Sequence, residues 1–103
     1  MSLGADLAEG IARDARLIIL RELALQVDGR LNAVSMNRVL QAYSISRSAE
    51  WIATQLNALN EVGAIALTDI GGLSVAAITD FGREHVEQRR TIAGVTKPSD
   101  LRG

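Results

Sequence analysis

The chain has 103 residues, of which 48% are hydrophobic and 22% charged, and this composition suits one compact globular domain rather than a disordered segment. Eleven basic and twelve acidic residues give a formal net charge of −1, so no overall positive field draws the protein to nucleic acid. The absence of cysteine excludes disulfides and thiolate metal sites, and no apolar run approaches the ~20 residues of a transmembrane helix.

Apolar spacing predicts a first helix from Asp6 to about Gln26. Its main apolar face consists of Leu7, Ile11, Ala15, Ile18 and Leu25. A second apolar strip contains Leu17, Leu20 and Ala24. The helix arginines, Arg13, Arg16 and Arg21, are expected elsewhere on its surface. A helix with two apolar sides must cover more than one neighbour, within the domain or across a dimer. We expect Leu17 and Leu20 to contact a second copy or a partner protein.

A helix-turn-helix pattern follows the first helix. Gly29 ends that helix, Leu31-Asn32 is a candidate short strand, and a second helix is predicted from about Ala33 to Tyr43. A third helix is predicted from Arg47 to Val62, with Ser46 as its candidate N-cap. The third helix has one apolar side, and its opposite side carries Arg47, Ser48, Thr54, Asn57 and Asn60. Two helices joined by a short turn, the second with a polar outer face, are typical of helix-turn-helix proteins.

Two alternating strands joined by Gly71-Gly72 come next, and this pair of glycines favours a two-residue hairpin turn. The predicted register runs from Ile65 beside Ile78 to Ile70 beside Leu73. One face, with Ile65, Leu67, Ala76 and Ile78, is expected in the core. The other face is apolar and contains Ile70, Leu73 and Val75. The hairpin tip lacks the Arg or Lys typical of minor-groove insertion, so we expect these three residues to contact a protein, the alternative being an exposed hairpin without a partner.

Thr79 is predicted to cap a fourth helix from about Asp80 to Arg90. Residues 91–103 are predicted to form an extended or flexible tail after a domain that spans residues 1–90. The order of three helices, a hairpin and a fourth helix predicts a mainly α, α+β winged helix-turn-helix with a two-stranded β-hairpin wing.

Several motifs also carry a family resemblance. Residues 59–65 (LNEVGAI) and 78–84 (ITDFGRE) look like two recurrent winged-helix signatures. Residues 13–21 (RDARLIILR), Gly71-Gly72-Leu73 and residues 94–99 (GVTKPS) resemble a family of small uncharacterised proteins of Mu-like transposable phages and prophages. The resemblance extends over almost the whole chain. It implies a winged-helix fold and a phage or prophage origin, and it brings no established activity. The absence of cysteine favours a reducing compartment, so we expect the protein in the cytoplasm of a host bacterium.

No set of residues predicts a catalytic, cofactor-binding or metal site. His85 is the only imidazole and is expected to face solvent, while Asp80, Glu84 and Glu87 are expected to form a solvated charged face. Gly71-Gly72 joins strand to strand, unlike a phosphate-binding loop. We therefore expect no enzyme activity, no cofactor and no small-molecule substrate.

Nucleic-acid binding is better supported than catalysis. Arg47, Ser48, Thr54 and Asn57 together could supply a guanine contact, phosphate contacts and an adenine contact. The turn and third helix hold one Arg and two Glu, however, which weakens attraction to phosphates and leaves a plain solvated charge as the alternative for Arg47. Trp51 is expected in the core or an interface. Two hypotheses remain. In the first, the chain is a winged-helix DNA-binding protein that resembles a transcriptional regulator and acts as a homodimer on double-stranded DNA. In the second, it is a phage assembly or DNA-packaging adaptor that uses the fold for protein contacts.

Overall fold

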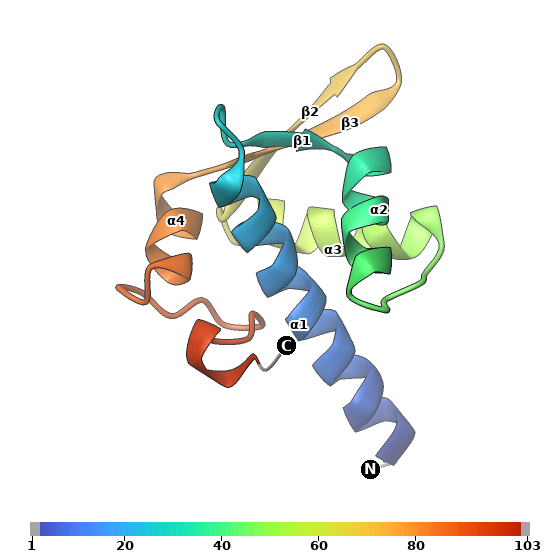
Figure 1. The fold of residues 1–103 in the computed structure, drawn as a ribbon, viewed down its shortest axis with the longest axis vertical. Helices are drawn as coiled ribbons and strands as arrows, with labels where there is room; N and C mark the ends of the chain where they lie inside the picture. The colour runs from blue at the N-terminus through green and yellow to red at the C-terminus, as the bar shows by residue number, and fades with distance from the viewer. Residues whose placement is uncertain (1–2, 102–103) are drawn as a thin grey trace.

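The computed structural model describes residues 3–101 and is mainly α-helical with a small three-stranded antiparallel sheet (Figure 1). The elements are, in chain order, α1 (Leu3–Leu25), β1 (Arg30–Asn32), α2 (Ala33–Ala42), α3 (Ala49–Glu61), β2 (Ile65–Ile70), β3 (Leu73–Ile78), α4 (Asp80–Val86) and the 3-10 turn η1 (Pro98–Asp100). Within residues 3–101, no helix is both long and apolar enough to cross a membrane.

The C-terminal half of α1 forms the centre of the core. It contacts α2, α3, α4 and β3, so this half of the helix is covered on several sides. Leu17 and Leu20 are both fully buried there. Their predicted role as a surface for a second copy or a partner is therefore wrong, because the second apolar strip of α1 is covered by other elements of the same chain.

The hairpin has the predicted register, from Ile65 opposite Ile78 to Ile70 opposite Leu73. Gly71 and Gly72 both adopt positive φ, at 60° and 83°, which a tight turn between these strands requires. The sheet has one strand more than the predicted two-stranded hairpin, because β1 pairs with β3 and sets Arg30 opposite Ala77 and Asn32 opposite Val75.

Thr79 caps α4 as predicted and also fixes this helix to the start of β2. Its Oγ1 accepts a hydrogen bond from Gly82 N–H and donates one to Gly63 O at 2.6 Å. Gly82 is buried so closely against β2 that an added Cβ would overlap the Ala64 carbonyl oxygen and lie 3.0 Å from Ile78 Cγ1. Only glycine fits at this position without displacing the backbone.

The chain beyond α4 differs from the predicted tail. Helix α4 ends at Val86 rather than near Arg90, and Gln88 then takes a φ of 62°, which turns the chain back toward α1. Ile92 and Val95 are buried, so residues 91–101 belong to the same packed unit as residues 3–90. Residues 102–103 of the predicted tail lie outside the described residues.

His85 holds this returning segment, and the prediction that it faces solvent is wrong. Its side chain is fully buried; Ile92 N–H donates to Nδ1 at 3.0 Å, and Nε2 lies 2.9 Å from Thr96 O. Because Nδ1 must accept from an amide, the proton is on Nε2, which donates to the Thr96 carbonyl. The imidazole thus satisfies two backbone groups of the C-terminal segment.

Candidate nucleic-acid interface

The region from α2 to α3 presents the residues that were predicted to contact DNA. Ser44, with φ 64°, ends α2, and the chain then runs extended to Ser48. Ser48, not Ser46, is the N-cap of α3, because its side chain accepts a hydrogen bond from Trp51 N–H at 3.1 Å. Helix α3 therefore begins two residues later than predicted, and Arg47 lies in the extended segment just before it.

All four predicted contact residues are exposed on this side of the molecule: Arg47, Ser48, Thr54 and Asn57. Their chemistry is not equivalent. The Thr54 hydroxyl donates to Glu50 O at 3.0 Å within its own helix. The Ser48 hydroxyl accepts from Trp51 N–H and keeps its proton for an external acceptor such as a phosphate oxygen.

Arg47 is held against Trp51. Its guanidinium carbon lies 5.6 Å from the centroid of the indole ring, and Nη1 donates to Ser46 O at 3.1 Å. A cation over an aromatic face is attracted by the ring quadrupole, which restricts the arginine to one side of the N-terminus of α3. Trp51 is half-buried and packs against the core, so it forms a fixed base for Arg47.

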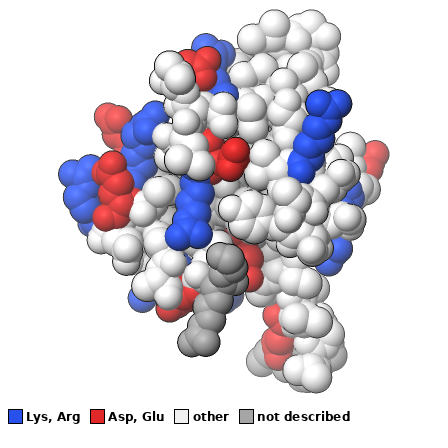
Figure 2. All heavy atoms as spheres, viewed as in Figure 1, with Lys and Arg blue, Asp and Glu red and all other residues white. Residues whose placement is uncertain are grey.

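Charge is mixed on this side of the molecule. The sequence of α3 contains no Lys or Arg, while Glu50 and Glu61 are both exposed on it. The nearest exposed bases in sequence are Arg38 on α2 and Arg47. On the face shown in Figure 2, where α1 and α2 lie in front of α3, basic and acidic side chains are also interspersed. Any attraction to phosphate must therefore come from a few arginines and from the N-terminal end of α3, where the backbone carries partial positive charge.

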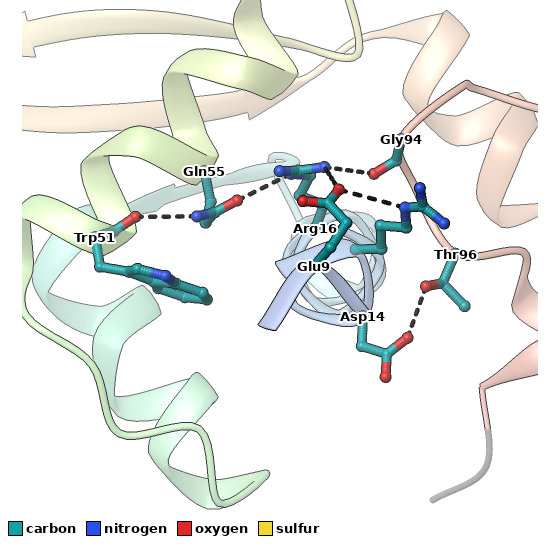
Figure 3. A network of polar contacts seen from close by, with 8 residues as sticks. Glu9, Asp14, Arg16, Trp51, Gln55, Gly94 and Thr96 are labelled. Atoms are coloured by element: carbon teal, nitrogen blue, oxygen red, sulfur yellow. Dashed lines mark hydrogen bonds and ion pairs between the residues drawn. The ribbon is translucent and has the colours of Figure 1, made fainter. Parts of the chain in front are cut away.

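A buried polar network fixes the orientation of α3, and sequence reasoning missed it (Figure 3). Arg16 Nε donates to Gln55 Oε1 at 2.9 Å, and Arg16 Nη1 donates to Gly94 O at 2.7 Å. Gln55 is 3% exposed and its Nε2 donates to Trp51 O. One arginine of α1 thus connects α3 to the C-terminal segment. The expectation that Arg16 lies away from the packed faces is wrong.

Two further contacts complete the network on the C-terminal side. The Thr96 hydroxyl donates to Asp14 Oδ1 at 2.6 Å, and Glu9 lies 3.6 Å from Arg16 Nη1. A sequence signal for the network existed: Arg16 lies on the same side of α1 as the buried residues Ala12, Ile19 and Leu23, at helical spacing. An arginine inside such a strip needs a hydrogen-bonded partner.

The apolar residues predicted on the outer hairpin face do come together. Ile70, Leu73 and Val75 line a shallow groove of about 420 Å³ with Arg30 and Leu31 from the β1 region. Ile70 is 59% and Leu73 36% exposed, while Val75 is half-buried. The hairpin end, at the upper right of Figure 2, is mostly uncharged on the face shown. Among residues 3–101, no three His, Asp or Glu side chains gather as possible metal ligands.

Comparison with known proteins gives one distant relationship. The chain is similar to the uncharacterized protein gp26 of Escherichia phage Mu, with 28% identity over 88 residues that cover 85% of this chain and 91% of gp26. No protein-family model matches the chain. No solved structure matches it either.

Proposed function

We propose that this protein is a winged-helix DNA-binding protein of a Mu-like phage or prophage, resembling a transcriptional regulator. In this proposal α3 is the recognition helix, α2 crosses the DNA backbone and the β2–β3 hairpin is the wing. The observation that carries the proposal is the exposed side of the α3 region, where Arg47, just before the helix, and Thr54 and Asn57, on the helix, are all exposed. The similarity to the Mu protein supports the phage origin.

The proposed contacts follow from the positions along α3. The N-terminus of α3 approaches the DNA first, with Arg47 restrained by Trp51 and the Ser48 hydroxyl directed to phosphates. Asn57 lies about two turns further along the helix and has the donor and acceptor pair that recognises adenine in the major groove. Thr54 lies between them and contributes through its methyl group, since its hydroxyl proton is used by Glu50 O.

Few basic residues take part, so the proposal predicts weak binding with a shallow salt dependence. Two or three phosphate contacts correspond to a slope of roughly −2 to −3 in a plot of log affinity against log salt. Fluorescence anisotropy with a random-sequence duplex at low and moderate salt measures both quantities.

The matched variants are Arg47→Ala and Arg89→Ala. Arg89 is an exposed arginine that pairs with Glu87 beyond α4, outside the proposed interface. Arg47→Ala should weaken binding about tenfold and reduce the slope by roughly 1, whereas Arg89→Ala should change neither. Equal effects of the two variants, or no binding by the wild type even at low salt, would contradict the proposal.

A second candidate function is a phage assembly or packaging adaptor, favoured by the apolar hairpin groove at Ile70, Leu73 and Val75. A DNA-inserting wing tip typically carries Arg or Lys, and this one offers Ile70, two glycines and Leu73. A photo-crosslinking amino acid at Leu73, tested during phage growth, should then yield a single defined adduct. The same probe at exposed Val27 is the control, and indistinguishable adduct patterns would argue against the adaptor.

A further inference from the structure

We propose that the N-terminal half of α1 is a dimerisation surface, and that its occupant is the same half of α1 from a second copy, packed antiparallel. The first turns of α1 extend beyond all other elements (Figure 1). Leu3 is 84% and Leu7 64% exposed in this projecting part. An isolated helical end of this length is only marginally stable in water, so tertiary or quaternary packing is needed to hold it.

The exposed leucines continue into a hollow of the same molecule. Helical spacing sets Leu3, Leu7, Ile11 and Ile18 on one side of α1. Ile11 and Ile18 line a cavity of about 320 Å³ together with Tyr43, Ile45 and Leu101, and the polar part of its lining comes from Asp14, Ser44 and Arg47. The projecting strip and the hollow therefore share one face of one helix. A second copy related by a two-fold axis sets its own Leu3 and Leu7 against this hollow, and its hollow receives these leucines in return.

Charge on the flank of this strip is self-complementary in the antiparallel orientation. Asp6 and Arg13 lie seven residues apart, about two turns, so both occupy the same flank of α1. In antiparallel packing, equivalent flanks of the two helices face each other. The register that sets Leu7 opposite the second copy's Ile11 also brings Asp6 next to the second copy's Arg13, twice per dimer. Arg13 can reach this position because its side chain is 55% exposed; its Nε donates to Glu9 Oε1 at 3.3 Å, an exposed pair whose remaining guanidinium donors stay free for the second copy's Asp6.

Gly10 lies near the crossing point of the two helices. No atom lies within 4 Å of the position that a Cβ would take there, so the backbone can be approached closely. A few apolar side chains and two exposed ion pairs form the proposed contact, so we expect a weak dimer with a dissociation constant on the order of 10 µM. The hollow shares Arg47 with the proposed DNA interface, but self-association is measured without DNA, so its outcome is independent of whether the protein binds DNA.

Sedimentation velocity from low micromolar to submillimolar concentration tests the surface. The wild type should change from monomer to dimer over this range, and Leu7→Glu should raise the dissociation constant at least tenfold. Leu25→Glu is the control, because Leu25 is 77% exposed at the other end of α1. A wild type that stays monomeric, or a control variant as defective as Leu7→Glu, overturns the proposal. A dimer that is lost in Leu73→Lys and retained in Leu7→Glu also overturns it, in favour of the hairpin.

Charge reversal tests the orientation. Asp6→Arg alone and Arg13→Asp alone each set like charges opposite each other and should weaken the homodimer about tenfold. An equimolar mixture of the two variants should form a heterodimer of near wild-type affinity, because the basic flank of one then faces the acidic flank of the other. A variant that had merely lost structure would not regain affinity in this mixture, and failure of the mixture to associate overturns the antiparallel arrangement.

Discussion

Replacing Gly82 by alanine should be among the most destabilising single-methyl changes in this protein. Gly82 is buried in α4 against Ala64, the residue just before β2, and an added Cβ would overlap the Ala64 carbonyl oxygen while lying 3.2 Å from the Ala64 carbonyl carbon. Both contacted atoms are backbone, so a side-chain rotation cannot relieve the overlap. The start of α4 must move away from β2.

That movement has a calculable cost. It strains or breaks the bonds that Thr79 makes to this region, from its N–H to Ala64 O at 3.1 Å and from its hydroxyl to Gly63 O. Overpacking of a core typically costs 1–3 kcal/mol and each lost hydrogen bond about 1 kcal/mol, so we expect Gly82→Ala to lower the free energy of unfolding by ~3 kcal/mol. For a domain of this size, that corresponds to a drop in Tm of roughly 12–24 °C.

Urea denaturation followed by circular dichroism measures this change, with Gly4→Ala as the matched control. Gly4 lies in α1 and a Cβ there meets nothing within 4 Å, so the same substitution should be neutral or stabilising by up to ~1 kcal/mol. If Gly82→Ala remains within ~1 kcal/mol of the wild type, the close approach of α4 to β2 is not as the structure has it, and the explanation of this glycine fails.

Three further predictions concern the core and the C-terminal segment. Arg16→Met should lower the free energy of unfolding by ~2 kcal/mol in urea denaturation, because it leaves the buried Gln55 amide oxygen and the Gly94 carbonyl without their donor. A loss no larger than that of Arg89→Met would show that the network does not stabilise the fold. His85→Phe should cost about 2–4 kcal/mol and speed amide hydrogen exchange across residues 92–96, because Ile92 N–H and Thr96 O lose their partners; unchanged exchange in that segment would contradict this. Leu17→Lys should prevent folding, because Leu17 is fully buried, whereas Leu73→Lys should leave the melting temperature nearly unchanged, because Leu73 is 36% exposed. Similar melting temperatures for the two variants would contradict the assignment of Leu17 to the core and Leu73 to the surface.

The features that sequence predicted well are those decided by neighbours along the chain. The Gly71-Gly72 turn fixes the hairpin register, because a two-residue loop leaves only one pairing that puts Ile65 and Leu67 on the buried face. Thr79 caps α4 through a hydrogen bond three residues away. The exposure of Thr54 and Asn57 follows from the helical period alone, since Ile52 and Leu56 on the opposite side are buried.

Apart from small shifts at the ends of α3 and α4, the failures involve contacts between segments far apart in sequence. Nothing local in residues 91–101 shows that Ile92 and Val95 are core residues, since the segment has neither helical nor strand periodicity. Its placement depends on His85 and Arg16, which bond to backbone atoms up to 78 residues away. The burial of Leu17 and Leu20 likewise depends on distant parts of the chain, because α2, α3, α4 and β3 pack around α1.

Helix α1 consequently has two distinct roles along its length. Its C-terminal half is covered by α2, α3, α4 and β3, and Arg16 there joins α3 to the returning chain. Its N-terminal half projects, with Leu3 and Leu7 exposed and Asp6 and Arg13 on one flank. Because the helix is continuous from Leu3 to Leu25, the orientation of α3 relative to the projecting half is fixed through Arg16 and Gln55. If two copies pair through the projecting halves, the same contacts fix the relative positions of the two α3 helices. Arg16→Met should therefore weaken DNA binding more in the dimeric wild-type background than in the monomeric Leu7→Glu background.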